Sequence, residues 1–113
     1  MGCIFCGIAQ GDVPARTILE TDEVVAFHDL DPKAPTHVLV IPRRHVASID
    51  AMADGDEELI GRVFAAAKEV ARQQGIADDG YRLVTNIGRN AGQSVDHLHV
   101  HVLGGRRMTW PPG

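Results

Sequence analysis

The sequence predicts an α+β fold in which a five-stranded antiparallel sheet carries one long and one short helix. An apolar stripe at helical spacing runs through residues 55–74, whereas most of the remaining chain consists of short apolar runs bounded by glycine, proline or aspartate. Three strand-like segments precede the long helix and two follow it, which favours a meander-type antiparallel sheet. The 113 residues suffice for one core, so we expect a single domain over residues 1–113.

The long helix has the clearest pattern, because its apolar positions recur every three or four residues. Asp54 and Glu57 stand three residues apart and predict a capping box at its start. Gly75 predicts its end. A short helix is expected near residues 3–10, with Gly11 as its stop.

Five segments have the short apolar or alternating character of strands. The first two flank Thr21 and Asp22, which predict a two-residue hairpin turn. The third is almost continuously apolar and precedes Pro42, as expected for a buried strand. The predicted strands are residues 16–20, 23–29, 37–41, 81–87 and 97–103.

The composition argues against several classes of protein. Hydrophobic residues make up 44% of the chain and charged residues 23%, and the formal net charge is −4. No basic stripe dominates, so nucleic acid is not an expected partner. No apolar run is long enough to span a membrane, and the first residues lack the features of a secretory signal. We therefore expect a cytoplasmic location and no membrane partner.

Residues 97–101, HLHVH, place three histidines at a spacing of two, which on a strand puts them on one face. Simple packing is a poor explanation, because buried imidazoles need polar partners and Val or Thr would pack better. A metal site made by all three is also disfavoured. The first and last would lie about 13 Å apart along the strand, whereas the ligand atoms of one zinc ion lie within a few ångströms.

Nucleophilic catalysis explains this spacing best. Neutral imidazole is a nucleophile near pH 7 and can attack phosphorus, provided that neighbouring groups hold its other nitrogen and bind the phosphoryl oxygens. His99, in the middle, is the natural nucleophile, and His101 is the natural partner of the phosphate.

The segment HLHVHVL matches at every position the signature of the histidine-triad (HIT) family of nucleotide hydrolases and transferases. The likeness is to the Hint branch, and the segments that carry it are CIFCGI, FHDLDPKAPTHVLVIPRRH, GYRLVTNIG and GQSVDHLHVHVLGGRRMTWPPG. The resemblance implies a homodimer whose two sheets join into one continuous ten-stranded sheet. It also implies hydrolysis of purine nucleoside phosphoramidates, such as AMP joined to lysine or another amine, through a nucleotidyl-histidine on His99 that water then cleaves.

The resemblance implies roles for further residues. The backbone carbonyl of His97 is expected to hold His99 in one tautomer, and His37 resembles the family's fourth active-site histidine. Asp29 is expected to accept hydrogen bonds from the ribose hydroxyls, and Ser94 resembles the residue that holds the phosphate and the leaving group. The other expected contacts to the purine nucleotide, AMP or GMP, are Ile4, Phe5, Ile8, Val13, Phe27, Leu30, Asn86, Gly92, Gln93 and His101.

Cys3 and Cys6 form a C-x-x-C pair, which can be a redox pair, half of a metal site or two small apolar residues. A redox pair calls for a βαβ context, which is missing. Two thiolates can hold half of a tetrahedral zinc, and His45 and His97 are the histidines left to complete it. Zinc-bearing members of the histidine-triad superfamily use the same arrangement, so the resemblance implies a structural zinc on these four residues.

Three functions compete at this point. The chain resembles phosphoramidases most, but a dinucleoside polyphosphate hydrolase, as in the Fhit branch, and a nucleotide-binding regulatory protein with incidental catalysis stay open. The final residues MTWPPG favour the Hint-like phosphoramidase. Trp110 in this tail either packs on its own subunit or, as the resemblance implies, reaches towards the partner's active site.

Overall fold

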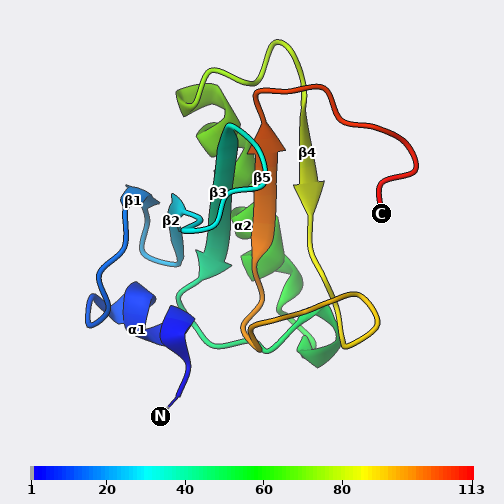
Figure 1. The fold of residues 1–113 in the computed structure, drawn as a ribbon. Helices are drawn as coiled ribbons and strands as arrows, with labels where there is room; N and C mark the ends of the chain where they lie inside the picture. The colour runs from blue at the N-terminus through cyan, green and yellow to red at the C-terminus, as the bar shows by residue number, and fades with distance from the viewer. Residues whose placement is uncertain (1) are drawn as a thin grey trace.

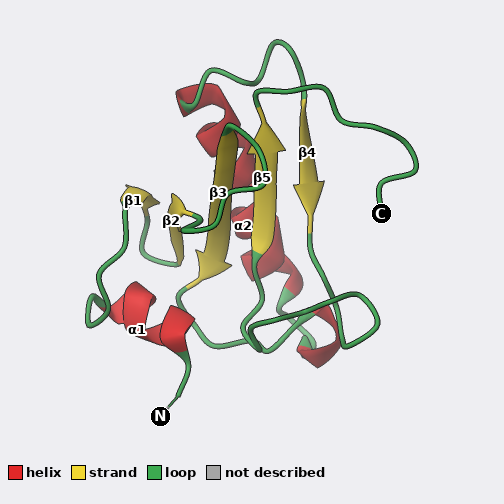
Figure 2. Cartoon of the chain, in the orientation of Figure 1, coloured by secondary structure: helices red, strands yellow, loops and turns green. Residues whose placement is uncertain are grey.

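The computed structural model describes residues 2–113, so the first residue of the predicted domain lies outside the described residues. The chain forms one five-stranded antiparallel sheet with two α-helices (Figures 1 and 2), which confirms the predicted fold class. Its elements are α1 (Ile4–Gln10), β1 (Thr17–Glu20), β2 (Val24–His28), β3 (Thr36–Pro42), the short 3₁₀ helix η1 (Ile49–Ala51), α2 (Glu57–Gln73), β4 (Tyr81–Val84) and β5 (Val100–Gly104). Neither α-helix is long and apolar enough to cross a bilayer, within the part of the chain described.

The sheet is not the simple meander that the order of elements favours. Its strand order is β1-β2-β3-β5-β4, so the last strand inserts between β3 and β4. Val102 of β5 lies opposite Val38 of β3 on one side and Leu83 of β4 on the other. The strand that carries His101 is therefore inside the sheet, with hydrogen-bonded neighbours on both edges.

Side chains alternate between the two faces of the sheet, as the pleat requires. α2 lies across one face, where its apolar side packs on alternate residues of β2, β3 and β5. α1 covers the lower end of the other face (Figure 1), where Phe5 and Ala9 pack on Phe27, Leu39 and Ile41. The face opposite α2 is thus only partly covered by helix, which leaves room for a pocket.

The long helix confirms the prediction except at its start. It begins two residues later than a capping box on Asp54 requires, and Asp56 is the N-cap residue. The Asp56 carboxylate does not bond to the helix; it accepts a hydrogen bond from the Ala53 backbone N–H and pairs with Arg44. The other end agrees with the sequence, because Gly75 has a φ of 74° and closes a Schellman turn on the helix.

The predicted strands all exist, but four are shorter than predicted, whereas β3 is one residue longer at each end. β4 ends at Val84, and β5 begins at Val100 rather than at residue 97. The predicted hairpin turn is displaced by one residue, since Thr21 N–H already bonds to the Val24 carbonyl across the turn. Of the three alternating histidines, only His101 belongs to a regular strand.

Residues 97–99 leave the regular ladder because other groups take up their backbone bonds. Leu98 N–H donates to the Val46 carbonyl at 2.7 Å, and the Leu98 side chain is buried with Val46 and Leu59 beyond the end of β5. The ring of His97 donates from Nε2 to the Pro42 carbonyl at 2.8 Å. This segment is therefore ordered by specific contacts outside the ladder.

Candidate active site

His99 is held in one orientation by its neighbours. Its Nδ1–H donates to the backbone carbonyl of His97 at 2.7 Å, the contact expected from the resemblance. Its ring also packs edge-on against Phe5, at a centroid separation of 5.2 Å, and against His101 at 5.1 Å. Because Nδ1 carries the proton, the lone pair of the neutral ring lies on Nε2.

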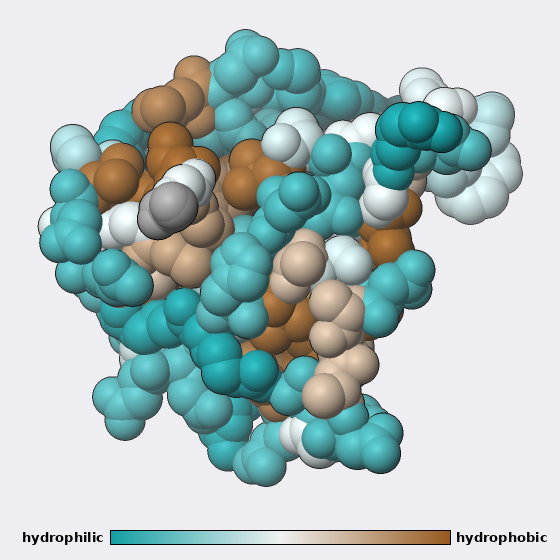
Figure 3. Space-filling model, turned by 90° about the horizontal axis from the view of Figure 1, so that it is seen from below, coloured by the Kyte–Doolittle hydropathy of each residue, from teal (hydrophilic) through white to brown (hydrophobic). Residues whose placement is uncertain are grey.

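A pocket of about 260 Å³ opens beside His99 on the sheet face that α1 covers. Seen from below, the molecule shows several apolar patches among polar surface (Figure 3). Ten of the predicted site residues line the pocket: Ile4, Phe5, Ile8, Val13, Phe27, Asp29, Leu30, Ser94, His99 and His101. The pocket is therefore apolar at one end, with imidazole, carboxylate and hydroxyl groups elsewhere along its wall.

Five further residues of the wall were not among the predicted ones: Pro14, Ala15, His28, Leu39 and Val95. Most are sequence neighbours of predicted residues, so a wider window around each would have included them. Leu39 is different, because it lies across the sheet from His101 and only the β3–β5 pairing brings it there.

Three predicted nucleotide contacts, Asn86, Gly92 and Gln93, do not line the pocket. The Asn86 side-chain amide donates to the Ala91 carbonyl at 2.8 Å. The Gln93 amide donates to the carbonyls of Ala47 and Val95 at 2.7 and 3.0 Å. These side chains hold the loop that precedes His97, so they shape the site through the loop that presents Ser94.

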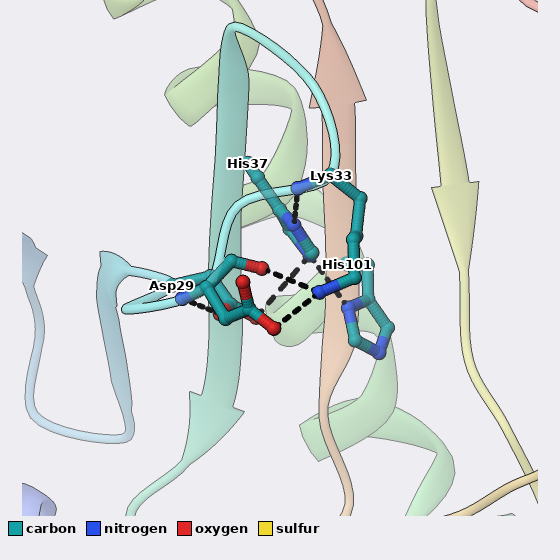
Figure 4. A network of polar contacts seen from close by, with 5 residues as sticks. Asp29, Lys33, His37 and His101 are labelled. Carbon is teal, nitrogen blue, oxygen red and sulfur yellow. Dashed lines mark hydrogen bonds and ion pairs between the residues drawn. The ribbon is translucent and has the colours of Figure 1, made fainter.

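On one side of His99, Asp29, His37 and His101 form what we call the carboxylate-side cluster (Figure 4). The Lys33 backbone N–H donates to His37 Nδ1 at 3.0 Å, so the His37 proton lies on Nε2. That nitrogen lies 2.9 Å from His101 Nδ1 and 3.4 Å from Asp29 Oδ2. The remaining proton of His101 is therefore on Nε2, the nitrogen not used inside the cluster.

Burial keeps the two imidazoles of this cluster neutral. Desolvation, reinforced by the neighbouring His99 and His37, lowers the pKa of His101 from 6.5 to about 4, against the opposing effect of Asp29. Desolvation also lowers the pKa of His37, although the Asp29 carboxylate acts in the opposite direction. At neutral pH His101 is a neutral hydrogen-bond donor.

On the other side of His99, Cys3, Cys6, His45 and His97 form the cysteine-side cluster. Their ligand atoms all lie within 4.8 Å of one another, so this group could hold a metal ion. Nδ1 of His97 lies 3.3 Å from Cys3 Sγ and 3.6 Å from Cys6 Sγ, and Nδ1 of His45 lies 3.3 Å from Cys6 Sγ. The structure thus brings together all four predicted metal ligands.

These contacts fit a tetrahedral metal centre. Zinc bonds of about 2.3 Å to sulfur and about 2.0 Å to nitrogen place tetrahedral ligand atoms roughly 3.5 Å apart, close to the observed separations. Burial lowers the pKa of His97, which favours the neutral ligand form. Its Nε2–H is already bonded to Pro42, the outer hydrogen bond that metal-binding histidines usually make.

The Trp110 side chain does not pack on its own subunit. Trp110 is 81% exposed, although Arg82 anchors the start of the tail by donating to the Thr109 carbonyl at 2.9 Å. An exposed indole near a chain end leaves a large apolar surface without a partner.

Comparison with known proteins agrees with this geometry. The chain is similar over 99% of its length to a HIT family hydrolase from Legionella pneumophila, all of which it covers, with 48% identity and a TM-score of 0.96. It is similar to a histidine triad nucleotide-binding protein from Candida albicans, with 31% identity, a TM-score of 0.82 and coverage of 97% of this chain and 83% of that one. It is similar to a zinc-bound histidine triad family protein from Mycobacterium smegmatis, with 33% identity, a TM-score of 0.82 and coverage of 94% and 76%.

The family model of the HIT domain matches residues 10–108, which include both β3 and the complete histidine triad. Fold, arrangement of the three histidines and sequence therefore agree, and the chain belongs to the HIT domain family.

Proposed function

We propose that this protein hydrolyses nucleoside 5′-monophosphate derivatives, foremost purine nucleoside phosphoramidates, through a nucleotidyl-His99 intermediate. The 2.7 Å contact between His99 Nδ1 and the His97 carbonyl carries the proposal, because it leaves the Nε2 lone pair available to attack phosphorus. Similarity to a HIT family hydrolase and to a histidine triad nucleotide-binding protein supports the same chemistry.

The pocket supports a purine nucleotide as the ligand. Its apolar end, with Phe5 and Phe27 5.5 Å apart, suits a flat base. Asp29 lies on the same wall, and its carboxylate has lone pairs that can accept hydrogen bonds from ribose hydroxyls. His101 donates from Nε2 to the phosphoryl oxygens, which stabilises the charge that develops during transfer.

In the first step, His99 Nε2 bonds to the α-phosphorus while the bond from phosphorus to the amine nitrogen breaks. The departing nitrogen keeps the bonding electron pair and takes a proton from water. The nucleotidylated imidazole is cationic, and the His97 carbonyl stabilises it through the Nδ1–H bond. Water then attacks phosphorus, His99 leaves as neutral imidazole, and the nucleoside monophosphate and a proton are released.

The test compares the wild type with His99→Ala on an AMP phosphoramidate, quenched within the first turnover. The wild type should gain the mass of one AMP moiety on His99, and the variant should lose both adduct and turnover while still binding AMP. Near-normal turnover by the variant would contradict the mechanism. A parallel assay with a diadenosine polyphosphate distinguishes the candidate functions. Faster cleavage of the polyphosphate than of the phosphoramidate would favour a polyphosphate hydrolase, and slow cleavage of both substrates would favour a regulatory protein.

We further propose that the cysteine-side cluster binds one structural zinc ion through Cys3, Cys6, His45 and His97. The donor set of two thiols and two imidazoles suits zinc, and the zinc-bound relative from Mycobacterium smegmatis supports the choice. When bound, the ion would act as a cross-link that fixes the start of α1 and the segment before His99. Catalysis needs no open coordination position there.

The oligomer proposed is a homodimer joined through β4. In this chain β4 is the last strand on its side of the sheet, so its outer edge is open to a second copy among the residues described. Pairing of two β4 strands would give a continuous ten-stranded sheet. Sedimentation should therefore report a dimer. The substitution Arg82→Pro on this edge should weaken the association of the two subunits.

A further inference from the structure

The hydroxyl of Thr85 contacts the backbone of the proposed nucleophile. Thr85 follows the last residue of β4, and its Oγ1 donates to the backbone carbonyl of His99 at 2.9 Å. Thr85 is not among the residues whose roles the histidine-triad resemblance implies. We propose that Thr85 is a positioning residue, which holds His99 in place for the reaction proposed above, on which this inference rests.

The reason lies in where the sheet ends. Backbone pairing of β5 with β4 stops at His101 opposite Val84, and pairing with β3 stops at Val100 opposite Val40. The His99 carbonyl therefore lies beyond the ladder. His99 must be held in a fixed position for the reaction, yet it lacks regular strand pairing. The Thr85 side chain supplies the hydrogen bond that a longer ladder would have supplied.

Thr85 also holds this segment from the β4 side of the sheet. The bonds from Leu98 N–H to Val46 and from the His97 ring to Pro42 tie the segment towards the β3 side of the sheet. Thr85 reaches it from the β4 side, so the segment is held between two strands. Within residues 97–99, the His97 carbonyl then fixes the ring of His99, and Thr85 fixes the peptide that follows it.

The substitution Thr85→Val removes the hydroxyl and keeps the shape of the side chain. Loss of one part-buried hydrogen bond costs about 1 kcal/mol, so losing a bond that holds the reacting geometry should lower the rate roughly fivefold. We expect the single-turnover rate of nucleotidyl-His99 formation to fall by about this factor, with the dissociation constant for AMP unchanged. Thr85→Ser should restore most of the rate.

Thr17→Val is the matched control, because Thr17 is an exposed strand residue on β1, far from the triad in the sheet order. It should leave rate and affinity as in the wild type. An unchanged rate in Thr85→Val, or an equal loss in Thr85→Ser, would overturn the positioning role. A parallel loss of AMP affinity and rate would do the same, since it would indicate a general disturbance of the pocket.

Nitrogen NMR of the His99 ring separates this inference from the proposed function. In the wild type the spectrum should show the proton on Nδ1, and in Thr85→Val a mixture of the two tautomers. If the wild type forms no nucleotidyl-histidine at all, the proposed function fails, and this spectrum alone decides the role of Thr85. An identical spectrum in both proteins would refute it.

Discussion

The two clusters beside His99 differ in what faces their imidazoles. Each contains two histidines, joined by two thiols in one cluster and by one carboxylate in the other. Within each cluster, all ligand atoms lie within 4.8 Å of one another. In the cysteine-side cluster, Nδ1 of His45 and Nδ1 of His97 point at sulfur, and the bond from His97 Nε2 to the Pro42 carbonyl leaves that Nδ1 available. In the carboxylate-side cluster, both nitrogens of His37 are already bonded, one to the Lys33 N–H and the other to His101.

This difference assigns opposite tasks to similar residues. Free nitrogens beside thiols make a ligand set for a soft divalent metal. Nitrogens committed to a hydrogen-bond chain instead set tautomers, and the chain from Lys33 through His37 leaves His101 with its proton on the outward nitrogen. Counting histidines therefore does not distinguish a metal centre from a donor relay, whereas the partner of each ring nitrogen does.

The largest effect is expected from breaking the carboxylate-side cluster. His101→Ala removes the donor proposed for the phosphoryl oxygens, and losing one such donor costs roughly 100-fold in rate. The rate of single-turnover nucleotidylation with an AMP phosphoramidate measures this loss. His28→Ala is the control, since His28 lines the pocket but belongs to neither cluster. Equal rates in the two variants would show that the relay does not support catalysis.

Breaking the cysteine-side cluster should separate metal from chemistry. Cys6→Ser removes the sulfur that contacts both His45 and His97, so metal content should fall from about one zinc per chain to a small fraction, with a lower melting temperature. The rate of nucleotidylation should fall only a few-fold, because His101 and His37 are untouched. Metal analysis and thermal unfolding of reduced protein check this, and full metal occupancy in the variant would refute the ligand set.

A smaller, pH-dependent effect follows from the buried His101. Its pKa is lowered from 6.5 to about 4 in the folded state by burial and by the nearby His99 and His37. Between these values the unfolded chain binds more protons, so the free energy of unfolding should decrease as the pH falls from about 6.5 towards 4. Urea unfolding at pH 7 and pH 5 should show a weaker decrease in His101→Ala. The same decrease in both proteins would argue against His101 as a source of the pH dependence of stability.

The smallest effect is expected from a segment outside both clusters. Deleting residues 110–113 removes the exposed Trp110 and leaves metal ligands and donor relay in place. If the tail reaches a partner's site, the ratio of kcat/KM for a bulky and a small amine should change, with AMP affinity unaltered. An unchanged ratio in the truncated protein would exclude the tail from leaving-group selection.

The sequence predicts local features well and distant pairings poorly. Alternation identifies the triad, because side chains two residues apart on a strand share a face. The C-x-x-C spacing identifies Cys3 and Cys6, and the remaining histidines together with the family resemblance supply His45 and His97. The start of α2 escapes prediction because Asp56 bonds to Ala53 and pairs with Arg44 rather than capping the helix. Thr85 escapes it because its partner lies on a strand that inserts between two others.

The contacts of residues 97–99 also restrict where insertions and deletions can occur in the chain. His97 faces the thiols, Leu98 fills the core with Val46 and Leu59, and His99 faces the pocket. One inserted or deleted residue between positions 97 and 101 would exchange the two faces, placing an imidazole in the apolar core and a leucine among the sulfurs. Insertions and deletions that preserve function should therefore occur in the exposed loop of residues 88–92 and be absent from residues 97–101.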